Sequence, residues 1–303
     1  MIHEYALEPA LLSDWNNFRY FTEKFGVPHG RLISRYPQKW KRMVYESLYG
    51  CGEVERKKIE EGLRNLDEKI LRRPNSRWNP ELQWLPNAEL EHQRKPFHAI
   101  LAIANPGGMA FVLRGDEVDD NNALWRVSRT RIVPREAAQM AQAVGPLMLF
   151  SEVIRLVDPH FNPNREEYCR ALQEFVRVAL ENRAFPLTTI EVHLSADGEG
   201  KPTAEYFSGR CQAVLPNLIP AGVRVRLIRW RKKDGGEELH NRYVLTEFGG
   251  IRFGAGLDEG GAGETDELEI LDNDAYRTRF GQYDPGGTTF DLADQVVVVG
   301  TRH

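Results

Sequence analysis

Between residues 135 and 230 the chain alternates between segments typical of helices and segments typical of buried strands, which restricts the folds open to it. The patterns predict helices at 135–150, 165–182 and 203–217 and strands at 153–157, 189–194 and 223–230. Strands separated by helices of this length are joined by crossover connections and lie parallel in one sheet. The alternation therefore predicts an α/β fold with a mixed, mostly parallel sheet covered by helices.

The segment Leu239–Asp258, LHNRYVLTEFGGIRFGAGLD, contains the most specific residue spacing in the chain. β-Branched and aromatic residues flank a Gly-Gly pair, so the segment is predicted to form two strands joined by a tight turn. Side chains two positions apart share one face of a strand, so His240 and Arg242 are expected side by side. Glu247 falls at the turn, where it cannot stand beside His240 on that face.

The order His-x-basic-x4-acidic in this segment resembles the motif of the phospholipase D superfamily, His-x-Lys-x4-Asp-x6-Gly-Ser-x-Asn. The matching positions are His240, Arg242, Glu247, Gly254, Ala255 and Leu257. His240 and Gly254 are identical to the motif, whereas its lysine, aspartate, serine and asparagine are each replaced. A member with four replacements is expected to bind its ligand with weak turnover or none.

A closer similarity is to the phospholipase D-like domains that follow microtubule-interacting-and-transport domains, which also carry His-x-Arg and a Gly-Leu-Asp ending. The similarity covers roughly residues 151–292 and includes VDPHF, HNR, GAGLD and TTFDL. That group lacks the catalytic pattern and resembles a membrane-binding, non-catalytic branch. Residues 1–95 have no such counterpart.

The reaction that the superfamily motif implies needs a neutral imidazole to attack phosphorus, a cation to hold the phosphate, and a second histidine to protonate the leaving oxygen. One copy of the motif supplies one histidine, and the sequence shows no internal repeat. An active chain is therefore expected to be a homodimer that pairs two sites across a two-fold axis. The catalytic candidates, if the protein is active, are His240, Arg242 as the phosphate clamp, and Glu247.

The sequence VDPHF places Asp158 and His160 at the carboxyl end of the predicted strand 153–157, where open α/β sheets bind their ligands. His160 is the candidate for a second histidine within the same chain. The alternative is that the Asp-Pro pair simply caps the strand and turns the chain. The candidate binding residues are Asp158, His160, Arg242, Gly254 and Asp258. His98 and His193 fall within apolar strand patterns and are expected in the core.

Residues 1–95 are predicted to form a small helical domain, because apolar residues recur at helical spacing in 32–48 and 59–70. Three prolines between residues 74 and 86 break regular structure and place the boundary near residue 95. The α/β domain then covers 96–303 and begins with two strands, in 96–113, joined by a turn. Basic clusters in the first domain are interpreted as solvated helix faces, with a surface for nucleic acid or an acidic partner protein as the alternative.

The net charge of the 303-residue chain is −4, and it is unevenly distributed. Residues 1–95 hold 17 Lys and Arg against 14 Asp and Glu, and the remainder holds 23 against 30. This asymmetry is too mild to indicate a nucleic-acid surface. Eight acidic residues between 258 and 274 have no basic residue among them, so this stretch is expected to be a solvated loop that repels phosphates.

Three cysteines at unrelated spacings argue against a disulfide framework and against a cysteine-based metal site. No metal-ligand spacing is specific, and no cofactor is expected. The sequence contains no apolar run of 18 residues and no charged-then-apolar leader, so a soluble, cytoplasmic protein without a transmembrane segment is expected.

Three hypotheses follow for the function. The favoured one is a divergent phospholipase D-like module that binds a phosphate-bearing ligand or a protein partner within a larger assembly. The second is a dimeric, metal-independent phosphodiesterase or nuclease that uses His240, and its ligand would be nucleic acid or another phosphodiester. The third is a protein-interaction subunit whose helical front half binds the partner. A bacterial accessory or antiviral-defence role is compatible with a helical domain fused to such a module.

Overall fold

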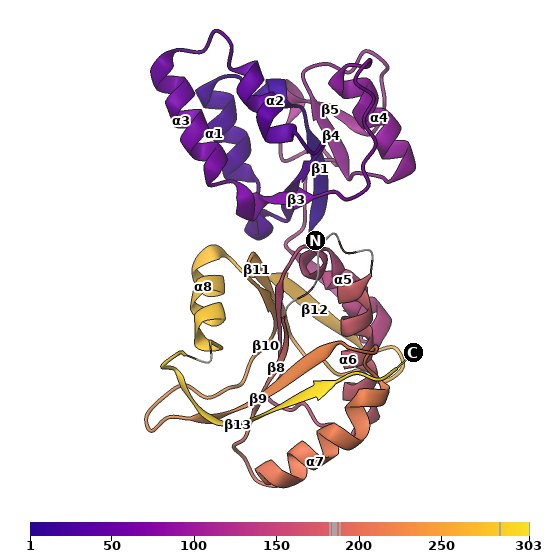
Figure 1. Cartoon of the computed structure of the whole chain (residues 1–303), viewed down its shortest axis with the longest axis vertical. Helices are drawn as coiled ribbons and strands as arrows, with labels where there is room; N and C mark the ends of the chain where they lie inside the picture. Colours follow the sequence, from indigo (N-terminus) through magenta and orange to yellow (C-terminus); the bar gives the residue numbers. More distant parts are fainter. Residues whose placement is uncertain (182, 184–186, 188, 285, 303) are drawn as a thin grey trace. The chain divides into compact units, whose positions relative to one another are not determined.

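The structure is a computed structural model that describes residues 1–302 except 182, 184–186, 188 and 285. The chain divides into an N-terminal unit, Met1–Arg129, and a C-terminal unit, Thr130–His303 (Figure 1). Each unit combines helices with its own sheet, which confirms the predicted α/β class. No described helix has the length and the apolar character needed to cross a membrane.

The N-terminal unit is built on a five-stranded sheet with the order β3-β2-β1-β4-β5, and all of its strand pairs are parallel. Its strands are β1 (His3–Leu7), β2 (Arg31–Arg35), β3 (Ile70–Arg72), β4 (Ala99–Ala102) and β5 (Val112–Arg114). The central strand is β1, in which Tyr5 is opposite Ile33 on one side and Ala99 on the other.

Helices cover both faces of this sheet (Figure 1). They are α1 (Trp15–Lys24), α2 (Trp40–Ser47), α3 (Glu53–Arg64) and α4 (Trp84–Arg94). Alternate residues of β1 enter different cores, as the two-residue period of a strand requires. Tyr5 and Leu7 pack with residues of α1, α2 and α3, whereas Ala6 packs with residues of α4. The sheet therefore separates two apolar layers.

The structure corrects the prediction of a helical domain over residues 1–95. Three of the five strands lie within that range, and the boundary between the units falls at residue 129. The two strands predicted in 96–113 exist as β4 and β5, but they pair in parallel and belong to the N-terminal unit. The strands of this sheet are only three to five residues long, and β1 and β4 are buried on both faces, so they lack the alternation that marks an exposed strand.

The C-terminal unit is built on an eight-stranded mixed sheet with the order β13-β9-β8-β7-β10-β11-β12-β6. β7, β8 and β9 are parallel neighbours, and the other pairs are antiparallel. Its strands are β6 (Thr130–Pro134), β7 (Val153–Val157), β8 (Thr189–Ser195), β9 (Arg224–Lys232), β10 (Arg242–Thr246), β11 (Gly249–Phe253), β12 (Thr265–Ile270) and β13 (Phe290–Val299).

Within the described residues, four helices accompany this sheet, and Figure 1 shows α8 on the opposite side of it from α5, α6 and α7. They are α5 (Ala137–Leu149), α6 (Glu166–Leu180), α7 (Ala204–Val214) and α8 (Asn273–Gln282). The predicted alternation of helices and strands between 135 and 230 is present, with β7 at its predicted bounds. The predicted last residue of the second helix, 182, lies outside the described residues.

The acidic stretch from residue 258 to residue 274 was predicted to be a solvated loop without basic partners. The structure corrects this prediction. Part of it forms β12, in which Asp266 is 4% exposed. Arginines from elsewhere in the unit neutralise other members, because Arg135 pairs with Asp258 and Glu264, both at 2.9 Å. Arg170 pairs with Glu259. The expected repulsion of phosphates by this stretch is thereby reduced.

His193 lies in the core as predicted, with no exposed surface. Its Nδ1 accepts the indole N–H of Trp230 at 2.9 Å, so the neutral ring carries its proton on Nε2, which lies 3.1 Å from Glu191. Glu191 also binds Arg155 at 3.0 Å and Arg226 at 2.7 Å. The buried carboxylate is therefore fully compensated.

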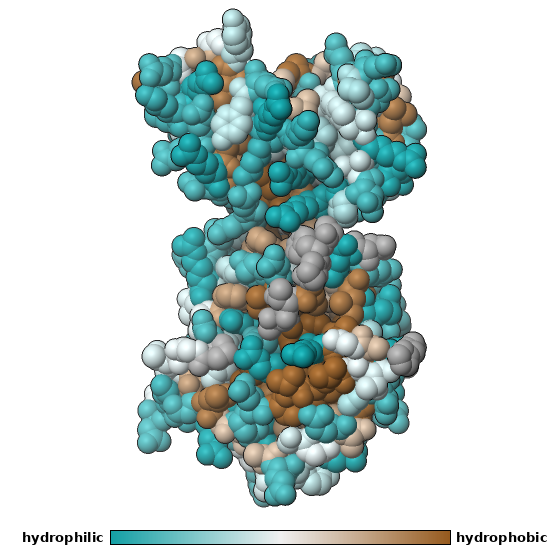
Figure 2. Space-filling view, viewed as in Figure 1, coloured by the Kyte–Doolittle hydropathy of each residue, from teal (hydrophilic) through white to brown (hydrophobic). Residues whose placement is uncertain are grey.

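The edge strand β13 exposes apolar side chains. Figure 2 shows hydrophobic residues gathered over β9 and β13 in this view. On β13, Leu292, Val297 and Val299 are each about half exposed. The Val297 carbonyl accepts a hydrogen bond from Gln212 of α7, which partly blocks this edge for a further strand.

Candidate functional site

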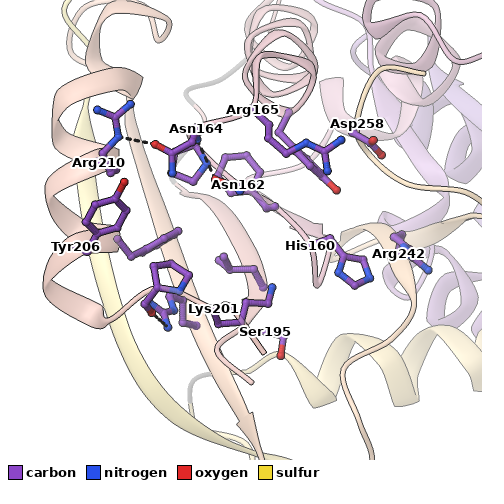
Figure 3. A pocket seen from close by; sticks show the side chains of 18 of the residues that line it. His160, Asn162, Asn164, Arg165, Ser195, Lys201, Tyr206, Arg210, Arg242 and Asp258 are labelled. Atoms are coloured by element: carbon purple, nitrogen blue, oxygen red, sulfur yellow. Dashed lines mark hydrogen bonds between the residues drawn. The ribbon is translucent and has the colours of Figure 1, made fainter. Parts of the chain in front are cut away.

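A pocket of about 500 Å³ lies where the parallel strands β7 and β8 end (Figure 3). Residues 160–165 line it from the connection after β7, and residues 194, 195 and 199–202 line it from the end of β8 and its connection. α6 and α7 contribute Tyr168 and Tyr206. The pocket therefore occupies the position at which open α/β sheets bind ligands, as the sequence predicted for His160.

Arg242 reaches this pocket because β10 runs antiparallel to β7. Tyr243 is opposite Val157, so Arg242 lies beside the residues that follow β7. Its Nε is buried and has no hydrogen-bond partner among the described residues. Figure 3 shows the guanidinium beside the imidazole of His160. Two of the predicted binding residues are thus brought together.

His160 is an exposed imidazole at the pocket wall, held through its backbone. The backbone N–H of His160 donates a hydrogen bond to Asp158 Oδ1 at 2.8 Å. Desolvation lowers the pKa of His160, and the charges of Arg242 and Lys201 lower it further, while Asp158 opposes them. The imidazole is therefore largely neutral at pH 7, as a proton acceptor must be.

His240 differs from its predicted placement on a strand beside Arg242. β10 begins at Arg242, and His240 is an exposed residue of the preceding connection. It is outside the pocket lining, but it is close enough for its charge to lower the pKa of His160. His240 is two residues before Arg242, which lines the pocket.

Asp158 holds other groups of the site in position and is not among the side chains that line this pocket. It is 2% exposed, and its two oxygens accept the backbone N–H groups of His160 and Leu257, each at 2.8 Å. Burial raises the pKa of Asp158, and these two hydrogen bonds oppose the rise. The carboxylate thus joins two walls of the site.

The segment 254–258 forms a fixed wall. Asp266 accepts the N–H groups of Gly254 at 3.0 Å and Ala255 at 2.9 Å. A Cβ at Gly254 would lie 2.9 Å from the same Asp266 oxygen, so glycine allows this close approach. Gly254 does not line the pocket, whereas Ala255 and Asp258 do. Asp258 lines the pocket, and its carboxylate forms an ion pair with Arg135.

Glu247 lies at the far end of β10, so it cannot act with His240 or Arg242. Its carboxylate accepts the backbone N–H groups of Glu152 and Val153, where β7 begins. Because β7 and β10 are antiparallel, this end of the pair is remote from Arg242. The predicted catalytic role of Glu247 is thus corrected to a structural one, which is to fix the start of β7.

Most of the positive charge of the pocket comes from residues that the sequence analysis missed. The basic lining side chains are Arg135, Arg165, Lys201, Arg210, Arg229 and Arg242, and the acidic ones are Glu199 and Asp258. Arg135, Arg165 and Arg229 have carboxylate partners. Within the described part of the chain, Lys201, Arg210 and Arg242 have none within 4 Å. The pocket therefore keeps an excess of positive charge.

The connection after β8 is folded back so that Lys201 enters the pocket. Gly198 and Gly200 adopt φ values of +113° and +76°, which L side chains rarely adopt. Lys201 Nζ donates to the Pro159 carbonyl at 2.7 Å, and desolvation lowers the pKa of Lys201. Buried Arg229 holds the same connection by donating to the Pro202 carbonyl at 2.9 Å. The glycines flanking Glu199 were the sequence signal for this loop.

Arg210 and Tyr206 form the α7 side of the pocket, far from the motif in sequence. Arg210 Nε donates to Asn164 Oδ1 at 2.6 Å, which joins α7 to the connection after β7 (Figure 3). Tyr206 is 56% exposed. No sequence signal placed these residues beside Arg242, because they meet through the packing of α7 on the sheet.

The side chains present are suited to holding an anion. Among the described residues, no three His, Cys, Asp or Glu side chains come together to hold a metal ion. Arginine and lysine donate charge-assisted hydrogen bonds to phosphate or carboxylate oxygens, and a neutral imidazole can accept a proton.

Comparisons with known proteins assign no family to the chain. No family model and no curated protein matches it. Among solved structures, it is similar to TrmBL2, described as an archaeal chromatin protein with a novel mode of DNA binding. The two share 11% identity with a TM-score of 0.26, over 52% of this chain and 53% of that chain. The match thus spans about half of that protein.

Proposed function

We propose that the C-terminal unit is a divergent phospholipase D-like module that binds a phosphate-bearing ligand in the pocket, with weak turnover or none. The observation that carries the proposal is the set of three cations without carboxylate partners, Lys201, Arg210 and Arg242, around one cavity. The Arg242 guanidinium lines the pocket, and a guanidinium donates charge-assisted hydrogen bonds to phosphate oxygens.

The positions of the motif residues favour binding over catalysis. Arg242, at the basic position of the motif, lines the pocket, while Glu247, at the acidic position, is engaged at the other end of the strand. Arginine binds phosphate well without any proton transfer. The absence of Glu247 from the pocket should therefore impair catalysis more than it impairs phosphate binding.

The test is calorimetric titration of the full chain with inorganic phosphate, with bis-p-nitrophenyl phosphate and with a short single-stranded DNA. Arg242→Gln should weaken binding about 10-fold, which corresponds to about 1.4 kcal/mol. The matched control is Arg177→Gln, because Arg177 on α6 pairs only with neighbours on and just beyond its own helix and does not line the pocket. Equal binding by Arg242→Gln and wild type would refute the proposal.

A metal-independent phosphodiesterase is the second candidate, and it is favoured by His160 in the pocket and by His240 two residues before the pocket-lining Arg242. One imidazole would attack phosphorus and the other would protonate the leaving oxygen, so a single chain would hold both groups. Hydrolysis of bis-p-nitrophenyl phosphate that persists in EDTA and is lost in both His240→Ala and His160→Ala would support this candidate. Absence of hydrolysis together with retained binding would instead support the proposal of a binding module without turnover.

A further inference from the structure

A second concave surface lies in the N-terminal unit, along α4. It is a groove of about 320 Å³ formed by one face of the helix and by the connection that precedes the helix. Its lining residues are Arg77, Trp78, Asn79, Asn87, Leu90, Glu91 and Arg94. Neither the motif nor the pocket of the C-terminal unit includes any of them.

The groove is preformed because buried polar side chains of α4 fix the connection beside it. Asn87 is 3% exposed; its Nδ2 donates to the carbonyl of Asn79 at 2.9 Å, and its Oδ1 accepts the N–H of Asn79 at 2.7 Å. Glu91 is 1% exposed and accepts the N–H of Arg77 at 3.1 Å. A ligand would therefore meet a surface that needs little ordering, which favours affinity.

The walls of the groove are apolar and open to solvent. Trp78 is 36% exposed and packs edge-on against Tyr36, with ring centroids 6.0 Å apart. Leu90 is 54% exposed. A site with this much exposed wall cannot enclose most of a small molecule, as small-molecule sites do. It suits a large apolar side chain of a peptide that lies across the surface.

The charge in the groove is positive, and one arginine is uncompensated. Glu91 binds Arg73 at 2.9 Å and also binds Arg94, so its negative charge is already neutralised. Glu4 binds Arg73 at 2.7 Å from the other side. The guanidinium of Arg77 has no partner in the part of the chain that the structure describes. A carboxylate would complement it as a charge-assisted hydrogen-bond acceptor.

From these observations we propose that the α4 groove binds a segment of a partner protein in which Asp or Glu adjoins a large apolar side chain. The apolar side chain occupies the space between Trp78 and Leu90, and the acidic side chain pairs with Arg77. Tryptophan and arginine are the residue types that most often dominate such interfaces. The partner is therefore an acidic, apolar-bearing peptide.

The test is selection of a phage-displayed random hexapeptide library on the full chain, followed by fluorescence anisotropy with the enriched peptide as the probe. Enriched peptides should carry Asp or Glu within two positions of Trp, Phe, Leu or Met. Replacing the acidic residue of the probe by its amide should weaken binding about 10-fold, and Arg77→Gln and Trp78→Ala should each do the same.

The test requires variants that fold normally and a control variant outside the groove. Arg77 and Trp78 are on the surface, so both variants should retain the wild-type circular dichroism spectrum. The matched control is Arg64→Gln, an exposed arginine of α3 outside the groove, which should bind the probe as wild type does. The proposal is overturned by a selection that enriches nothing or enriches peptides without acids, and equally by a probe that binds Arg77→Gln and Trp78→Ala normally.

Discussion

The Asp158 carboxylate accepts the backbone N–H of Leu257 at 2.8 Å, and this bond joins segments that lie 99 positions apart in the chain. Its other oxygen holds His160. One buried side chain therefore sets the separation between the wall that carries the imidazole and the wall formed by residues 254–258. The geometry of the pocket depends on a residue that does not line it.

Asp158→Asn should reduce both stability and phosphate binding. An asparagine amide offers one acceptor oxygen, so one of the two buried N–H groups loses its partner, at a cost of about 1–3 kcal/mol. Chemical denaturation and calorimetric titration with inorganic phosphate measure the two effects. Asp234→Asn, at an exposed turn residue, serves as the control. Unchanged binding in Asp158→Asn would show that the two walls hold their positions without this carboxylate.

Gly256→Ala should disturb the same wall, whereas Gly281→Ala should not. A Cβ at Gly256 would lie 2.2 Å from Asp258 Oδ1, an oxygen that Arg135 holds in place, and overpacking of this kind costs about 1–3 kcal/mol. A Cβ at Gly281, near the end of α8, meets nothing within 4 Å, so alanine there should be neutral or stabilising by up to about 1 kcal/mol. The measurement is the pair of unfolding midpoints, and similar losses in both variants would contradict the argument.

Glu247→Gln should lower stability by about 1 kcal/mol and leave ligand affinity unchanged, because one of two backbone N–H groups at the start of β7 loses an acceptor. Calorimetric titration and hydrolysis of bis-p-nitrophenyl phosphate provide the readouts. A large fall in hydrolysis with unchanged stability would instead indicate that Glu247 takes part in catalysis.

His193 should make the C-terminal unit less stable as the pH falls below about 6.5, the ordinary pKa of histidine. Burial lowers the pKa of His193 in the folded protein, with Glu191 opposing and Arg155 and Arg226 adding to the effect. The unfolded chain therefore binds a proton at a pH where the folded chain does not, and protonation favours unfolding. Hydrogen exchange of β8 at about pH 7.5 and 5.5 measures the change. His193→Gln should show a smaller pH dependence, and an equal one would assign the effect to other groups.

Glu91→Gln should destabilise the N-terminal unit by about 3–5 kcal/mol, because Arg73, whose side chain has no exposed surface, loses one of its two carboxylate partners. It should also release the connection at Arg77, which weakens the proposed α4 groove. Thermal unfolding followed by tryptophan fluorescence reports this unit, since five of the six tryptophans, all except Trp230, belong to it. Glu89→Gln, on the same helix, is the control.

Secondary structure was predicted most accurately from the sequence where long periodic segments alternate. The helix beginning near Arg165 and the strand Val153–Val157 are found as predicted, because a 15-residue amphipathic helix and a buried β-branched strand each have a clear pattern. Placing His160 at the end of that strand required only the rule that parallel strands present ligand sites at their carboxyl ends. The prediction for Arg242 depended on its spacing in the motif.

The N-terminal sheet was missed because its strands carry little local signal. β2, RLISR, is five residues long and lies within apolar spacing that also fits a helix. α4 was missed because Pro86 was read as a helix breaker, yet it is the third residue of the helix, where its missing N–H is not needed. In both segments tertiary burial decides the conformation, and the local pattern does not.

The composition of the pocket could not be predicted from spacing. Lys201 and Arg210 come from the connection after β8 and from α7, and they meet Arg242 only through the packing of helices on the sheet. The acidic stretch was misread for a related reason, since Arg135 and Arg170 neutralise it from positions about 90 to 130 residues earlier in the sequence. Both results depend on long-range contacts.

The position of β1 at the centre of the N-terminal sheet affects the order in which that unit can form during synthesis. Residues 3–7 are synthesised well before their second neighbour, β4, which is made only with residues 99–102. Until then the strand that organises both cores has one open edge, and such edges invite pairing with other chains. β1 therefore stays open to pairing with other chains until most of the N-terminal unit, through residue 102, has been synthesised.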